Sequence, residues 1–170
     1  LFAEIEPLVV YAKDVPDARL APLLGGAPLP ADDDVIARGV DDLRWILAGD
    51  LTFAALAREF LENRREDVMA IYLRGPDAVC HKFWGAREHR QAGNLTTRDV
   101  VLFGGTVDRY YEETDRLIGG VVEKIDLSRT TLLLISDHGF QGGRQGLDGS
   151  VRSGIWMHRE LGTILVAGPA

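Results

Sequence analysis

The sequence predicts an α/β fold of three layers, in which helices cover both faces of a mostly parallel sheet. Three short apolar runs, at residues 68–74, 130–136 and 162–168, have the composition of strands buried on both faces. A long helical stretch separates the first run from the second. This alternation of strands and helices is typical of parallel sheets.

The chain of 170 residues is expected to form a single α/β domain. Residues 1–31 are predicted to be a loop-rich or cap segment, because prolines and a glycine pair divide them into short pieces, of which residues 8–12 resemble a strand. Residues 32–170 are predicted to form the sheet-and-helix core. The chain begins without methionine and stops just after a predicted strand, so we interpret it as part of a longer protein.

Apolar residues at helical spacing predict the helices of the core. The first runs from Asp32 to about Gly49, a residue that suits a helix terminus, and the second follows over residues 50–65 with Thr52 or Asp50 placed to cap its start. Helix is also expected over residues 98–125, where Gly104, Gly105, Gly119 and Gly120 weaken the pattern.

The net charge, the hydropathy and the cysteine content restrict the binding partners and the cellular compartment that the sequence suggests. A net charge of -7 argues against a nucleic-acid platform, because no basic stripe offsets the acidic residues. No run of about 18 apolar residues is present to span a membrane, and the start of the chain lacks the pattern of a signal peptide. The single cysteine, Cys80, cannot form an internal disulfide, which favours the cytoplasm but leaves the compartment open. We interpret Cys80 as a small buried apolar residue.

Metal-ligand residue types follow the first predicted strand. Asp77 and His81 are four residues apart. A helix that begins near Pro76, a residue type favoured at the first helical position, would place both side chains on one face. The spacing therefore allows both residues to bind one ion.

The same residue types accompany the other two predicted strands. Asp137 and His138 follow the second strand, and Gly139 allows the chain to leave extended geometry there so that both side chains can converge. His158 lies just before the third strand. Because ligands bind outside the carboxyl ends of strands in open α/β sheets, we expect these side chains to lie along one edge of the sheet.

This set of ligands indicates a particular chemistry. Mixed carboxylate and imidazole ligands suit zinc, with manganese and iron as alternatives. Two such ions about 3.5 to 4 Å apart would hold the attacking and leaving oxygens of a phosphoryl group. The ions would also allow a negatively charged chain to bind a negatively charged substrate.

Each candidate also has a purely structural interpretation. Residues 137–138 could form an ordinary turn after a strand. Asp77 and His81 could be a helix cap and a surface histidine, and His158 could lie in a solvated loop. We interpret His89 as solvated and assign it no role.

Together these segments resemble the type I phosphodiesterase and nucleotide pyrophosphatase family of the alkaline phosphatase superfamily. The resemblance is carried by "YLRGPDAVCHKFW" at residues 72–84, "LLLISDHGF" at residues 132–140 and "HRELGTILVAGP" at residues 158–169. It covers roughly residues 50–170. The resemblance implies an alkaline-phosphatase-like fold, of which this chain would hold an incomplete part.

The resemblance also implies roles for the candidate residues. It implies that Asp77, His81 and His158 hold one zinc ion, and that Asp137 and His138 help to hold a second. Family members carry a further metal-binding aspartate and a threonine or serine nucleophile upstream, which nothing in the first 50 residues matches. We interpret "GLDGS", which follows the second metal motif, as a coincidental likeness to that aspartate motif.

The expected function is therefore that of a two-metal hydrolase. The intact parent protein is expected to hydrolyse phosphodiester, pyrophosphate or phosphomonoester bonds of a small phosphorylated substrate such as a nucleotide, and this chain alone is expected to be inactive. The alternatives are a non-catalytic, metal-stabilised or scaffold α/β domain, a phosphonate or sulfate ester hydrolase, and a phosphotransferase.

Overall fold

The computed structural model describes residues 2–26, 34–64, 66–88, 96–142 and 158–169. The described elements, with η for 3-10 helices, are α1 (Phe2–Ile5), η1 (Glu6–Leu8), η2 (Ala12–Asp14), α2 (Asp17–Leu20), α3 (Asp34–Asn63), α4 (Gly75–Arg87), α5 (Thr97–Phe103), α6 (Thr106–Val122), β1 (Leu132–Ser136), β2 (Gly139–Phe140), β3 (His158–Arg159) and β4 (Thr163–Ala167).

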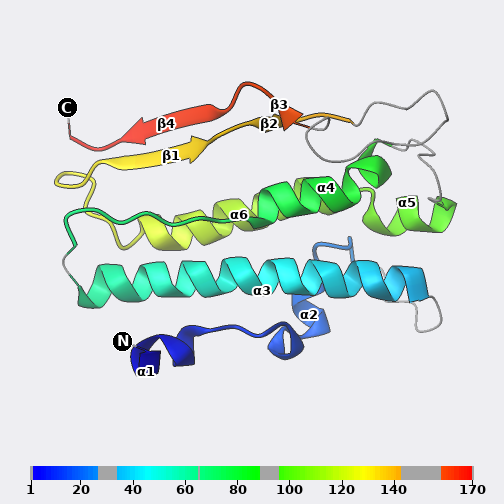
Figure 1. Cartoon of the computed structure of the whole chain (residues 1–170), viewed down its shortest axis with the longest axis horizontal. Helices are drawn as coiled ribbons and strands as arrows, with labels where there is room; N and C mark the ends of the chain where they lie inside the picture. The colour runs from blue at the N-terminus through cyan, green and yellow to red at the C-terminus, as the bar shows by residue number, and fades with distance from the viewer. Residues whose placement is uncertain (1, 27–33, 65, 89–95, 143–157, 170) are drawn as a thin grey trace.

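These elements lie in successive layers. In Figure 1 the strands run along one side, α4 and α6 lie next to them, α3 lies beyond those two helices, and α1 and α2 lie on the far side of α3. The apolar core lies where α3, α4 and α6 pack on one another and on the short N-terminal turns. Its buried side chains include Leu20, Leu43, Leu47, Val79, Phe83, Phe103, Val107 and Tyr110.

The longest element, α3, differs from the sequence prediction. We predicted two helices that meet near Gly49, but one helix continues through this residue, so this prediction is wrong. A glycine inside a helix costs only about 0.5 to 1 kcal/mol, and the apolar face on both sides of Gly49 is buried. The two predicted caps lie inside the helix, where Thr52 accepts a hydrogen bond from the Val10 amide at 2.9 Å and Asp50 is buried.

The other helices agree more closely with the sequence. The first turn of α4 contains Pro76, which confirms the predicted start. The helical region expected over residues 98–125 is divided into α5 and α6 at Gly104 and Gly105. Thr96 begins α5 with a capping box: its hydroxyl accepts from the Asp99 amide, and the Asp99 carboxylate accepts from the Thr96 amide.

The N-terminal segment is held against the helices by polar contacts. The strand that residues 8–12 could have formed is absent, because η1 ends and η2 begins within this range. The Arg44 guanidinium donates to the Val15 carbonyl and to the Asp17 carboxylate. The Arg19 guanidinium pairs with the buried carboxylate of Glu113 on α6 at 2.5 Å.

The described strands form two small antiparallel sheets. β1 pairs with β4, with Leu132 opposite Ala167 and Ser136 opposite Thr163. β2 pairs with β3, with Phe140 opposite His158. No parallel pair occurs in the described ranges, so the prediction of a mostly parallel sheet is wrong for this part of the chain. The physical reason is that β2 and β3 pair antiparallel, so the chain reverses its direction between them. β4 therefore runs along β1 in the opposite direction.

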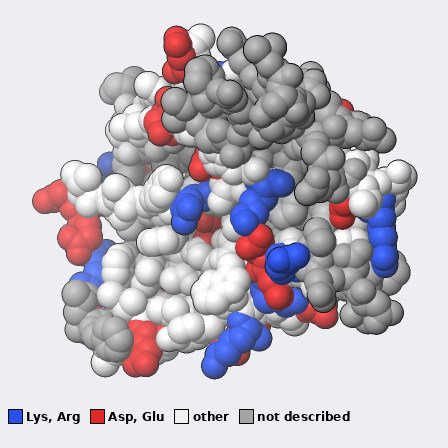
Figure 2. Space-filling view, turned by 45° about the vertical axis from the view of Figure 1, so that its right-hand side comes forward, with Lys and Arg blue, Asp and Glu red and all other residues white. Residues whose placement is uncertain are grey.

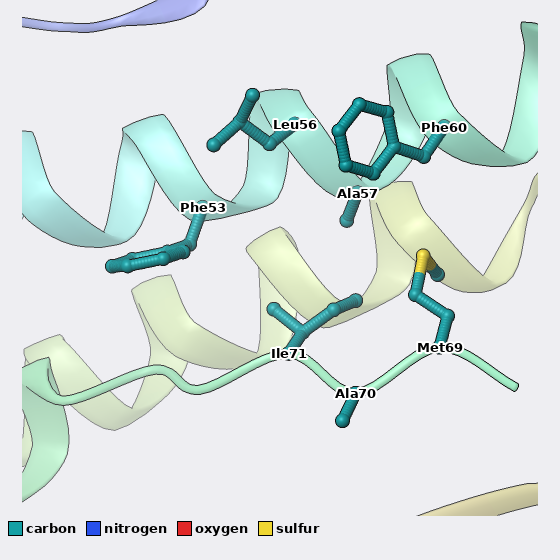
Figure 3. Close-up of a pocket in the computed structure, with 7 residues that line it drawn as sticks. All are labelled: Phe53, Leu56, Ala57, Phe60, Met69, Ala70 and Ile71. Atoms are coloured by element: carbon teal, nitrogen blue, oxygen red, sulfur yellow. The ribbon is translucent and has the colours of Figure 1, made fainter. Parts of the chain in front are cut away.

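The predicted burial of the strands is also not observed. Leu133 is 55% exposed and Ile164 is 68% exposed. The first apolar run, residues 68–74, forms no strand and instead runs along the helices. Figure 3 shows its Met69 and Ile71 directed toward α3, with which they line an apolar pocket. An apolar run predicts an extended backbone, but the segment against which it packs is decided by contacts with distant parts of the chain.

The surface carries both signs of charge. On the face shown in Figure 2, basic and acidic side chains lie close together with uncharged surface between them, and the described residues form no continuous basic stripe there. Among the described residues several charges are paired, as in Lys82 with Asp42 at 2.6 Å and Arg87 with Asp108 at 2.9 Å. Among the described helices, none has the length and apolar character needed to cross a membrane.

The continuity of α3 can be tested at Gly49. A methyl group at this position would meet nothing within 4 Å, so Gly49→Ala should raise the free energy of unfolding by about 0.5 to 1 kcal/mol through better helix propensity. Urea denaturation followed by circular dichroism measures the change. Gly119→Ala, at an equally open position in α6, is the matched control. A destabilised Gly49→Ala variant alongside a stabilised control would indicate that α3 is interrupted there.

Candidate metal centre

A carboxylate and three imidazoles meet where the start of α4 lies next to the small β2–β3 sheet. We call Asp77, His81, His138 and His158 the Asp–His cluster. The Asp77 Oδ1 atom lies 3.3 Å from Nε2 of His81, 3.4 Å from Nε2 of His158 and 3.8 Å from Nε2 of His138. Four of the five predicted ligand residues are therefore brought together.

Asp77 and His81 are placed by α4. Asp77 lies in the first turn and His81 one turn later, which gives the predicted approach of the two side chains. The buried face of the same helix, with Val79, Cys80 and Phe83, packs into the core. The opposite side of the first turn thereby presents the carboxylate and the imidazole to the strands.

His138 and His158 are placed by β2 and β3. His138 directly precedes β2, His158 begins β3, and their rings stack with centroids 3.7 Å apart. Nδ1 of His138 lies 3.0 Å from the Gly139 carbonyl oxygen. Because a carbonyl oxygen only accepts, this contact requires the proton on Nδ1 and leaves the lone pair of Nε2 directed at the cluster.

The buried oxygen of Asp77 fits a cation. Oδ1 is shielded from solvent and accepts no hydrogen bond from any described residue. Leaving a buried carboxylate oxygen without a partner costs on the order of 1 to 3 kcal/mol or more. Asp77, His138 and His158 each offer one ligand atom, and these atoms lie within 4.8 Å of one another. His81 Nε2 is 2.9 Å from His158 Nε2 and is available as a further ligand.

Asp137 lies outside this group. Its side chain is 91% exposed, with Oδ1 3.8 Å from Nε2 of His138. The family resemblance implies that His138 binds an ion together with Asp137, whereas His138 lies beside Asp77 and His158 in the structure. Which residue binds which ion stays a prediction.

Two aromatic side chains, Phe140 and Trp84, lie beside the Asp–His cluster. The Phe140 ring meets the His81 ring edge to face at 5.0 Å and lies 5.0 Å from the Trp84 ring. Apolar groups beside a metal site limit the access of water and strengthen electrostatic interactions. The sequence analysis assigned no role to Phe140, and the signal that could have found it is its position two residues after His138.

Cys80 is buried, as the sequence analysis expected. Its side chain is 1% exposed, and its Sγ lies 3.8 Å from the hydroxyl of Tyr111. Burial raises the pKa of the Cys80 thiol from 9.0 to about 11. The residue therefore stays a neutral thiol near pH 7, although it lies between two candidate ligands along the chain.

Comparison with known proteins identifies the class of protein. Residues 28–168 match the model of a phosphodiesterase and pyrophosphatase family, which is a family of hydrolases. Because the match covers most of the sequence, the chain belongs to the type I phosphodiesterase / nucleotide pyrophosphatase family. This confirms the resemblance seen in the sequence. No curated protein and no solved structure matched the chain.

The family match refines the description of the fold. The family implies an alkaline-phosphatase-like α/β architecture, while the described residues show mainly helices with small antiparallel sheets. Proteins of the family act on nucleotide or phosphodiester substrates. The "GLDGS" segment lies outside the described residues, as does His89.

The burial of Cys80 predicts a dependence of stability on pH. Because the folded pKa is raised, the folded chain keeps a proton that the unfolded chain releases above pH 9. The contribution of Cys80 is therefore complete below pH 9 and declines as the pH rises toward about 11. Relative to Cys80→Ala, the wild type should lose up to about 3 kcal/mol across this window. Urea unfolding at several pH values measures the difference, and a pH-independent difference would contradict the assignment.

Proposed function

We propose that the Asp–His cluster binds a divalent metal ion, most readily zinc, and serves the hydrolysis of a phosphoric ester or pyrophosphate bond. The observation that carries the proposal is the unpartnered, buried Oδ1 of Asp77, which faces three imidazole nitrogens. Membership of the hydrolase family supports the same chemistry. Manganese and iron are the alternatives that this ligand set accepts.

The ligand set matches what zinc requires. Zinc binds imidazole nitrogen and carboxylate oxygen, and catalytic sites use three protein ligands with one open position. Asp77, His138 and His158 form such a set, with His81 adjacent. A bound ion would polarise a phosphoryl oxygen and lower the pKa of a bound water.

The surrounding residues support this chemistry in separate ways. Asp77 supplies the negative charge that balances a cation. The Gly139 carbonyl fixes the orientation of the His138 ring. Phe140 and Trp84 keep water away from one side of the cluster. Asp137, exposed and 3.8 Å from His138, lies where it can join His138 at a second ion.

The substrate proposed for the intact parent protein is a small phosphorylated molecule such as a nucleotide or another phosphodiester. The chain carries a net charge of -7, so cations at the cluster would supply the local positive charge that an anionic substrate needs. The threonine or serine nucleophile is proposed to lie upstream of this chain, because nothing in the first 50 residues matches the family's nucleophile motif. This chain alone is therefore proposed to be inactive.

Metal binding is tested by titrating this chain with zinc in a calorimeter. We expect about one tightly bound ion per chain at the Asp–His cluster, with Asp77, His138 and His158 as its ligands. Asp77→Asn and His158→Ala should weaken binding at least about 100-fold, because each removes a direct ligand, whereas loss of outer groups costs about 10- to 100-fold. His89→Ala is the matched control, since the sequence assigns that histidine no role. Unchanged zinc affinity in both cluster variants would exclude this site.

The hydrolytic role is tested in the intact parent protein with a chromogenic bis-aryl phosphate. Asp137→Asn should reduce the rate by at least about 100-fold, because it would remove a ligand of the second ion in a two-metal site. Aryl phosphonate and aryl sulfate esters assayed in parallel distinguish the related hydrolases. A wild-type parent that binds zinc but cleaves none of these esters would favour the non-catalytic, metal-stabilised domain instead.

A further inference from the structure

A buried carboxylate links the three long helices next to the cluster. Asp50 of α3 is 2% exposed. Both of its carboxylate oxygens lie 3.1 Å from the amide nitrogen of Gly75, the first residue of α4. The Tyr110 hydroxyl of α6 donates to Oδ2 of Asp50 at 2.9 Å. One side chain therefore connects α3 and α6 to the start of α4.

The chemistry of a helix start explains this contact. The first amides of a helix have no partner within the helix, and they carry a partial positive charge. The N-cap residue Arg74 provides no side-chain capping hydrogen bond at this end. Asp50 thus supplies, from another helix, the acceptor that a capping residue usually provides.

The fit around Gly75 is close. A Cβ atom on Gly75 would lie 2.1 Å from both Oδ2 of Asp50 and the hydroxyl oxygen of Tyr110. Any larger residue would therefore displace one of these groups. The absence of a side chain at Gly75 allows the carboxylate and the hydroxyl to approach the backbone of the first turn directly.

We propose that Asp50 and Tyr110 are positioning residues, which fix the first turn of α4 so that Asp77 and His81 face His138 and His158. The inference rests on the proposed metal site and extends it to two residues outside the Asp–His cluster. Gly75 lies two positions before Asp77. A slip of the helix start by one residue would rotate Asp77 by about 100° around the helix axis, which would remove Oδ1 from the three imidazoles.

A purely structural role alone does not account for a carboxylate at this position. Burial raises the pKa of Asp50, while the hydrogen bonds from Tyr110 and from the amides of Gly75 and Arg74 act to lower it. A buried charged group is weak evidence for stability, because a well-packed apolar group is often equally or more stabilising. The directional hydrogen bonds of Asp50, by contrast, define the rotation of α4.

The first test uses amide hydrogen exchange in the wild-type chain. Amides in the first turn of a helix ordinarily exchange fast, because they lack intrahelical partners. The Gly75 amide should instead be protected, because it donates to Asp50. A Gly75 amide that exchanges at the rate of an unprotected one would overturn the proposal, whether or not the variants fold.

The second test compares folded variants by hydrogen exchange and by zinc affinity. Tyr110→Phe, which removes one oxygen, should speed exchange at Gly75 and Asp77 and weaken zinc binding about tenfold, the scale of effects from groups behind metal ligands. Asp50→Ala should speed exchange at these amides and weaken zinc binding by more than Tyr110→Phe does. Asp50→Asn should restore most of the affinity, because its amide oxygen can still accept from Gly75.

Tyr111→Phe is the matched control, because its hydroxyl lies beside Cys80 rather than Asp50. It should leave both measurements unchanged. A folded Tyr110→Phe variant with wild-type exchange or with wild-type zinc affinity would overturn the positioning role. A wild-type chain that binds no zinc would overturn the proposed function, while the exchange of Gly75 would still decide whether Asp50 fixes the helix start.

Discussion

The packing of α4 against α3 and α6 is the constraint on which the candidate site depends. Val79 and Phe83 place one face of α4 in the core, and this leaves Asp77 and His81 on the side that faces β2 and β3. Burial of such side chains contributes roughly 1.5 to 3 kcal/mol each. The apolar core therefore sets which face of α4 is buried, while the hydrogen bonds of Asp50 act on the start of the helix.

The identity of the site residues was easier to predict from the sequence than the way in which the elements that carry them pack together. The i, i+4 spacing of Asp77 and His81 and the start of α4 near Pro76 follow from helix geometry alone, which is local. The approach of His138 and His158 was expected only in outline, since it depends on the β2–β3 pairing. The predicted grouping of His138 with Asp137 relied on adjacency in sequence, whereas the structure brings His138 nearer to residues from other elements.

The errors in the fold prediction share a physical cause. Gly49 is a weak helix former, and the sequence gives no direct measure of how much buried apolar surface lies on either side of it. The apolar runs at residues 68–74 and 130–136 favour extended backbone, but their partners are set by contacts between distant residues. Asp50 was read as a cap for its own helix, while it supplies the same kind of interaction to α4.

The proposed metal centre of Asp77 and the three histidines can be tested by X-ray absorption spectroscopy of the zinc-loaded chain. The account predicts a first shell of nitrogen and oxygen ligands at about 2.0 to 2.1 Å, with outer-shell scattering from at least two imidazole rings and no sulfur. A shell of oxygen atoms without imidazole scattering would contradict the account. A sulfur ligand at about 2.3 Å would do so as well, because Cys80 would then be the site of binding.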